Sequence, residues 1–143
     1  MYGDNFMTNI NKSFEKIVNP TSDFLFSKDL LKNNEYMKAV YGKIFVEITR
    51  FIEKIPKITI QACGLRKKQK SLFYVGKIHC CSKQYQYILT VTFHKEVVNI
   101  TVNGKDLGES VIFGANMNKK TLIPSNIKVD LASFKQELSD MIN

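Results

Sequence analysis

The chain has 143 residues, of which 44% are hydrophobic and 24% charged, an ordinary composition for one globular domain that buries its core without metal or disulfide support. No apolar run approaches the roughly 20 residues of a membrane-spanning helix, and the N-terminal residues lack the basic start and apolar core of a secretory signal. Three cysteines, two of them adjacent, do not make a disulfide framework. We therefore expect a reducing setting, cytoplasmic or otherwise intracellular.

The formal net charge of +8 arises in one stretch that has no acidic residue. Between Glu53 and Glu96 there is no aspartate or glutamate, and the stretch from Lys57 to Lys95 within it carries eight bases, Lys57, Arg66, Lys67, Lys68, Lys70, Lys77, Lys83 and Lys95. The rest of the chain carries 13 bases and 13 acids, which cancel. A one-sided field of this kind bears on partners and encounter rates, not on fold. Because 19 of the 21 bases are lysine, codon usage also explains part of the total, so the segregation is the better evidence.

The first third of the chain is expected to be helical. Apolar residues at helical spacing predict a helix over Thr8–Val18, which Asn19-Pro20 ends, and a shorter one over Phe24–Leu31. The strongest pattern covers Glu35–Ile55, before Pro56. Its continuous apolar stripe consists of Met37, Val40, Tyr41, Ile44, Ile48, Phe51, Ile52 and Ile55. Such a stripe is typical of a helix that packs on a core.

After Pro56 the hydrophobic period changes from that of a helix to that of a strand. A first strand is expected over 57–63, and Gly64–Lys70 then reads as a basic loop at a hairpin tip. Asn103-Gly104 is a strong signal for a tight hairpin turn. The four further strands are expected over Ser71–Cys81, Tyr85–His94, Val97–Val102 and Leu107–Phe113. Short connections join them, so the sheet should be a five-stranded antiparallel meander.

The end of the chain is expected to return to helix. Gly114–Ile123 reads as a polar loop, and Asp130 can cap a last helix with Leu131, Phe134, Leu138, Met141 and Ile142 on one side. The prediction is therefore one α+β domain over 1–143, with a helical part at 1–56, a β-meander at 57–114 and a C-terminal helix at 125–143. The helices should pack on one face of the sheet and leave the other face open.

The hairpin after Cys81 sets a testable register for that open face. If Cys81 pairs with Gln86, one face shows Phe73, Val75, Lys77, His79 and Cys81 beside Gln86, Ile88, Thr90, Thr92 and His94. The first strand would add Lys57, Thr59, Gln61 and Cys63, and the fourth would add Asn99 and Thr101. A slip by one residue would bury lysine, so the register is well specified.

The residues we single out for binding combine the basic loop with the open face: Arg66, Lys67, Lys68, Lys70, Phe73, Lys77 and Ile88. Lysines beside an exposed aromatic ring are typical of sheets that bind single-stranded nucleic acid. The same residues also fit a solvated face, where threonine suits strands and lysine discourages pairing between edges. The scarcity of arginine argues against base-specific contacts. Both interpretations stay open at this point.

Metal binding and catalysis find little support in the sequence. Cys80 and Cys81 are neighbours in a strand and point to opposite faces, and His94 lies roughly 20 Å along the strand from His79 at about 3.3 Å per residue. Neither spacing resembles a zinc motif, and no phosphate-binding glycine motif is present. The sheet region has no carboxylate to activate either histidine. We therefore expect no metal, no cofactor and no enzymatic activity.

The leading hypothesis is a non-catalytic protein-binding or adaptor module, which dimerises or joins a larger assembly. The alternative is a non-specific nucleic-acid-binding protein that uses the acid-free face and the basic loop for phosphate contacts. A third class, a small enzyme with Cys81 as nucleophile near His79 and Lys77, would require a thiol of lowered pKa.

Overall fold

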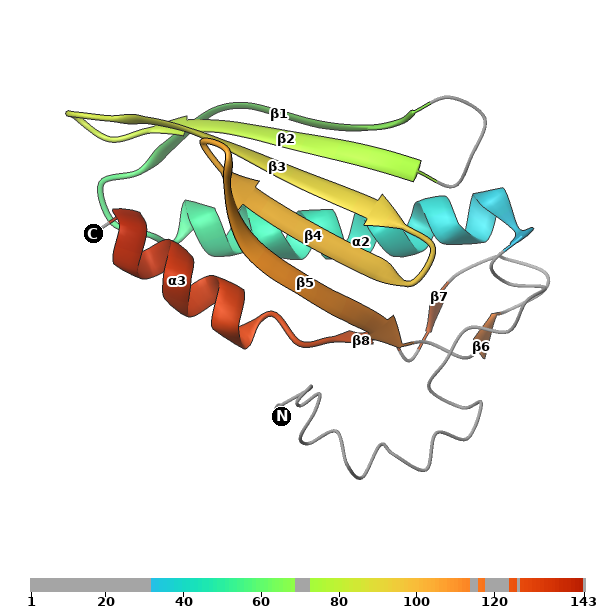
Figure 1. Cartoon of the computed structure of the whole chain (residues 1–143). Helices are drawn as coiled ribbons and strands as arrows, with labels where there is room; N and C mark the ends of the chain where they lie inside the picture. The colour runs from blue at the N-terminus through green and yellow to red at the C-terminus, as the bar shows by residue number, and fades with distance from the viewer. Residues whose placement is uncertain (1–31, 69–72, 114–115, 118–123, 126, 143) are drawn as a thin grey trace.

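The computed structural model describes residues 32–68, 73–113, 116–117, 124–125 and 127–142 (Figure 1). They form two α-helices and a six-stranded antiparallel sheet in the order β1-β2-β3-β4-β5-β8, which confirms the α+β class. The helices are α2 (Asn34–Glu53) and α3 (Ala132–Ile142). The strands are β1 (Thr59–Lys67), β2 (Phe73–Cys81), β3 (Gln86–His94), β4 (Val97–Val102), β5 (Lys105–Phe113) and β8 (Lys128–Val129). A separate two-stranded sheet joins β6 (Asn116–Met117) to β7 (Pro124–Ser125).

Helix α2 forms close to where the apolar stripe predicts it. The Asn33 side chain accepts a hydrogen bond of 3.0 Å from the backbone N–H of Tyr36, so it satisfies one of the N–H groups that a helix start leaves without an intrahelical partner. The helix ends at Glu53, shortly before Pro56. Its buried side chains are Tyr36, Met37, Val40, Tyr41, Ile44, Phe45, Ile48 and Ile52. The stripe is thus a core face, as expected.

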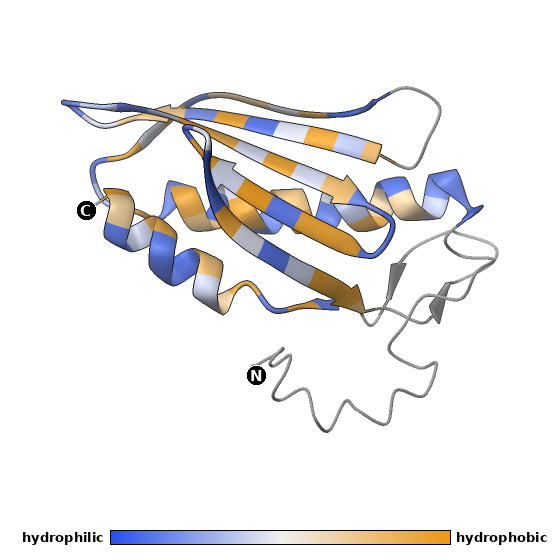
Figure 2. Cartoon of the chain, in the orientation of Figure 1, coloured by the Kyte–Doolittle hydropathy of each residue, from blue (hydrophilic) through white to orange (hydrophobic). Residues whose placement is uncertain are grey.

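The predicted register of the central hairpin is confirmed. Cys81 lies opposite Gln86, and Phe73 lies opposite His94 at the other end of the same ladder. Hydrophobic and hydrophilic residues alternate along the strands (Figure 2). The turn at Asn103-Gly104 has φ angles of 50° and 87°, as a tight hairpin requires. The sequence thus specifies the middle of the sheet well.

Three strand predictions need correction. The segment expected as the basic loop Gly64–Lys70 is strand as far as Lys67, because β1 continues to pair with β2. The sheet has a sixth strand, β8, which pairs with Ile112 and Phe113 and is too short to show a hydrophobic period. Part of the expected polar loop Gly114–Ile123 forms β6. The two predicted helices before Lys32, and Lys70, lie outside the described residues.

The two helices pack against different strands of a curled sheet and not on one flat face, so the predicted packing is not matched. The sheet curls, α2 contacts β1 and β2, and α3 contacts β5 (Figure 1). Strand twist and the register shifts in β1 and between β4 and β5 explain the curl. Lys135 of α3 joins the helices, because its Nζ lies 3.4 Å from Glu47 Oε2 and 5.4 Å from the centre of the Phe51 ring.

The C-terminal helix begins at Ala132, later than the predicted bound of 125, but it is capped by Asp130 as the sequence predicts. The carboxylate of Asp130 accepts a 3.0 Å hydrogen bond from the Ala132 backbone N–H, and Phe134 and Leu138 are buried. These side chains join Leu131 in the same core as α2 and the inner face of the sheet. Neither described helix has the length and apolar character needed to cross a membrane.

Candidate functional site

A bulge in β1 decides which side chains share the outer face of the sheet, the face that carries Val75, Lys77 and His79. Ile60 pairs with Cys80, but Ala62 pairs with His79, so Gln61 is an extra residue in the ladder. After the bulge, every side chain of β1 lies on the face opposite to the one that unbroken alternation predicts.

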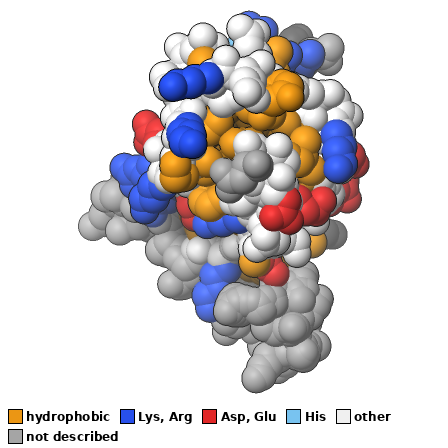
Figure 3. Space-filling model, turned by 90° about the vertical axis from the view of Figure 1, so that its left-hand side faces the viewer, with side chains coloured by type: hydrophobic (Ala, Val, Ile, Leu, Met, Phe, Trp, Pro, Cys, Tyr) orange, Lys and Arg blue, Asp and Glu red, His pale blue; other side chains and the backbone are white. Residues whose placement is uncertain are grey.

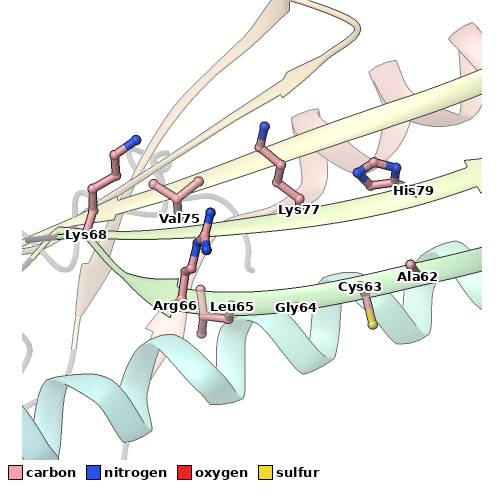
Figure 4. Close-up of a pocket in the computed structure, with 9 residues that line it drawn as sticks. All are labelled: Ala62, Cys63, Gly64, Leu65, Arg66, Lys68, Val75, Lys77 and His79. Atoms are coloured by element: carbon pink, nitrogen blue, oxygen red, sulfur yellow. The ribbon is translucent and has the colours of Figure 1, made fainter.

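The bulge corrects the expected position of Cys63. Cys63 lies opposite the buried Ile78 and projects toward α2, whereas we expected it on the open face (Figure 4). Gly64 and Arg66 take the outer face instead, opposite Lys77 and Val75. The residue pattern of β1 gives no sign of the extra residue, so periodicity alone does not predict that Cys63 changes face.

A shallow hollow of about 520 Å³ lies where β1 and β2 run side by side (Figure 4). The side chains of Arg66, Lys68, Lys77 and His79 project on its outer side, with Val75 among them (Figure 4). The complete lining is Ala62, Cys63, Gly64, Leu65, Arg66, Lys68, Val75, Lys77 and His79. Gly64 leaves room, because a Cβ built at this position has no neighbour within 4 Å. No residue of this lining is acidic, so the hollow favours an anionic group.

Acidic side chains of the described outer face occur at its other end. Glu109 lies opposite Asn99, and Asp106 lies opposite Thr101. Asp106 accepts hydrogen bonds from the Gly108 backbone N–H at 2.8 Å and from Asn99 Nδ2 at 3.0 Å, and these bonds lower the pKa of its carboxyl group. The outer face is therefore basic at β1–β2 and acidic at β5.

The remaining predicted binding residues do not all lie on the same face of the sheet. Phe73 stands at the end of β2 with its ring 5.9 Å from that of His94, and Ile88 is 42% exposed opposite His79. Lys67 is exposed but lies opposite the buried Tyr74, on the other side of β1 from the hollow. Arg66, Lys68 and Lys77 thus meet at the hollow, with Phe73 and Ile88 nearby on the same face.

Sequence reasoning missed the contributions of Ala62, Gly64 and His79 to the hollow. The first two were missed because the bulge is not visible in the residue pattern. His79 was placed on the correct face, but its neighbours across β1 were not known. A glycine within a strand often marks a close approach or an irregular stretch, and this is the one signal that the sequence offered.

The described cysteine and histidine side chains do not form a metal-binding cluster. Within the described ranges, no group of three or more His, Cys, Asp or Glu side chains is arranged to hold a metal ion. Cys80 is buried, and this burial, followed by its neighbour Cys81, raises the pKa of its thiol. Cys81 is half-buried on the outer face between Thr59 and Gln86.

A second surface lies at the end of the molecule that carries both the β2–β3 turn and the C-terminus of α3 (Figure 1). Figure 3 shows apolar side chains gathered there, bordered by basic and acidic ones. Tyr85 in the β2–β3 turn is 62% exposed, and Met141 and Ile142 of α3 are partly buried against the core. Apolar patches with a polar border are typical of protein contacts.

Comparison with protein-family models, with curated proteins and with solved structures finds no match to this chain.

Proposed function

We propose that this protein is a non-catalytic binding module that docks an acidic protein partner on the outer face of β1–β3. The observation that supports this most directly is the hollow, where Arg66, Lys68 and Lys77 surround a site without acidic lining. The exposed Ile88 on the neighbouring strand supplies apolar area beside these charges. Charged residues set orientation and association rate, and the apolar contact adds affinity.

Charge reversal on the two ends of the molecule tests the proposal. A triple variant, Arg66→Glu with Lys68→Glu and Lys77→Glu, is compared with a control that reverses Lys105 and Lys128, which lie in β5 and β8. The wild type and the two variants are each cross-linked in lysate of the source cell, and the captured proteins are identified by mass spectrometry. We expect acidic proteins that the wild type and the control capture to be lost from the triple variant. Equal capture by all three proteins would contradict the proposal.

Nucleic-acid binding is the second candidate, and the pairing of Phe73 with His94 favours it. Both rings lie on the outer face, at the end of β2 that adjoins Lys68. Stacking on aromatic rings contributes about 1–3 kcal/mol per base in single-strand binders. Against it, the described lining of the hollow offers only three cationic side chains for contacts to phosphate, those of Arg66, Lys68 and Lys77.

Fluorescence anisotropy with labelled single-stranded and duplex DNA and RNA, titrated over salt, decides this second candidate. Affinity that falls steeply and linearly on a log–log plot would support phosphate contacts. The Arg66, Lys68 and Lys77 triple variant should then flatten the slope. No binding near 100 mM salt would remove nucleic acid as the ligand.

A further inference from the structure

The two edges of the main sheet differ in length and exposure. β8 pairs through two residues, whereas β1 at the other edge is nine residues long. Its middle residues, Ala62, Cys63 and Gly64, are all exposed. No described strand pairs with β1 along the edge that faces away from β2. Proteins usually shorten or cover such an edge, because its backbone groups are ready to pair with another chain.

The backbone groups on this free edge can be identified from one hydrogen bond. The Lys68 N–H donates to the Phe73 carbonyl at 2.7 Å, so these two residues form a hydrogen-bonded pair. The pairing with β2 is regular from Lys67 back to Ala62, and hydrogen-bonded and non-hydrogen-bonded pairs alternate along an antiparallel ladder. The backbone N–H and C=O groups of Lys67, Leu65 and Cys63 therefore point away from β2. They form a regular row of donors and acceptors.

The charge of this edge selects the strand that can join it. Lys57, Arg66, Lys67 and Lys68 lie in or beside β1, in the stretch without acidic residues. A second copy of this chain would bring the same cations and no compensating acid to the interface. Opposite charges on neighbouring strands stabilise a pair by about 0.2–1 kcal/mol each, and like charges destabilise it. An acidic strand is thus the complementary occupant.

We propose that β1 accepts an acidic, extended segment of a partner protein as a further strand of the sheet. The backbone of Cys63, Leu65 and Lys67 binds the main chain of this segment, and the basic end of β1 attracts its acidic residues. Antiparallel addition places the N-terminal part of the segment beside Arg66–Lys68. The proposal rests on the proposed function, since both use the basic end of β1, but it adds a mode of binding that the hollow alone does not require.

The test uses a fluorescein-labelled synthetic peptide of three glutamates followed by alternating threonine and valine. Binding is measured by anisotropy near 100 mM salt. A matched peptide carries N-methyl groups on the alternate amide nitrogens that would face β1, which removes main-chain donors without a change in charge. We expect at least a tenfold loss of affinity for the methylated peptide. Equal affinity of the two peptides, or no binding of either, would overturn strand addition.

Two protein variants at one exposed position provide the complementary test. Cys63→Pro removes an N–H that points outward and is not part of the β1–β2 ladder, whereas Cys63→Val keeps it. We expect Cys63→Pro to bind the acidic peptide at least tenfold more weakly and Cys63→Val to bind like the wild type. Circular dichroism checks that both variants fold, and the methylated peptide keeps the test valid if the proline variant does not.

Other occupants give distinct results. A dimer in sedimentation that Cys63→Pro converts to monomer would identify a second copy as the occupant and overturn the acidic strand. Single-stranded DNA that binds equally to wild type and Cys63→Pro, and displaces the peptide, would also overturn it. If the Arg66, Lys68 and Lys77 variant loses its captured partners while Cys63→Pro retains them, strand addition fails and the proposed function stands. Unchanged capture by all variants contradicts both.

Discussion

The ring of Phe45 in α2 packs against β2 at the place where a side chain of residue 76 would begin. Gly76 lies on the inner face of β2, and a Cβ added there would overlap the Phe45 ring. The absence of a side chain therefore lets the helix approach the strand directly beneath the hollow. Val75 and Lys77, the residues before and after Gly76 in β2, line the hollow.

The first prediction concerns this contact. Gly76→Ala should lower the free energy of unfolding by about 1–3 kcal/mol, because overpacking displaces an aromatic ring in a dense core. Gly64→Ala is the matched control, since nothing lies within 4 Å of its added Cβ. Urea unfolding followed by circular dichroism measures both. A loss no larger at Gly76 than at Gly64 would contradict the close packing of Phe45.

The second prediction concerns the turn that joins β4 to β5, whose Asn103 side chain bonds to the backbone of β3. Asn103 has a φ of 50°, and its side chain accepts from the Ile88 N–H at 2.8 Å and donates to the Gln86 carbonyl at 3.3 Å. Asn103→Ala loses both hydrogen bonds and puts a residue that tolerates the left-handed region less well than asparagine at this position, at a cost of about 2–3 kcal/mol. Asn103→Gly removes only the hydrogen bonds, so it should be the milder change in urea unfolding. The reverse order would show that the left-handed backbone of residue 103 adds no cost for alanine, because both variants lose the same hydrogen bonds.

Much of the fold follows from local patterns, and the irregular parts do not. The helix at Asn34–Glu53 and the register of Cys81 with Gln86 were predictable, because periodic burial and short hairpins specify them. The bulge at Gln61 was not predictable, because one extra residue in a polar strand leaves no mark on its hydrophobic pattern. The hollow depends on that bulge, so its basic residues were predicted but their common location was not. β8 escaped prediction because two residues cannot show a period.

The third prediction is a loss of stability at alkaline pH. Burial raises the pKa of Tyr41, and nearby Tyr74 and Glu96 add to this effect. An unfolded tyrosine ionises near pH 10, whereas the buried group keeps its proton. Below pH 10 both states are protonated and the contribution is fully present. Above it the unfolded state binds fewer protons, so stability falls with pH, by up to about 1.4 kcal/mol per pH unit for this group.

Tyr41→Phe separates this effect from the hydrogen bond that the hydroxyl makes. Tyr41 Oη donates to the Lys95 carbonyl at 2.7 Å, so the variant should lose about 1 kcal/mol at pH 7. Its deficit relative to wild type should shrink at pH 11, because the variant has no proton to retain. Urea unfolding at pH 7, 9 and 11 measures this, with Tyr85→Phe as an exposed control. A deficit that stays constant across this range would argue against a buried, protonated Tyr41.

The fourth prediction uses the alkylation rates of the three thiols to report solvent access at the edge, the outer face and the inner face of the sheet. Cys63 is exposed on β1, Cys81 is half-buried on the outer face, and Cys80 is buried with a raised pKa. Alkylation needs the thiolate and access, so iodoacetamide at pH 8 should label Cys63 first, then Cys81, and Cys80 at least tenfold more slowly. Mass spectrometry of peptides over time gives the three rates.

The same labelling tests the enzyme interpretation of Cys81. An activated nucleophile would react faster than an exposed thiol, so Cys81 would lead the series in place of Cys63. The described neighbours of Cys81 across the ladder, Thr59 and Gln86, carry no charge to stabilise a thiolate. We therefore expect Cys81 to trail Cys63 at every pH between 6 and 8. A Cys81 rate above that of Cys63 at pH 6 would reverse the assignment of this protein to the non-catalytic class.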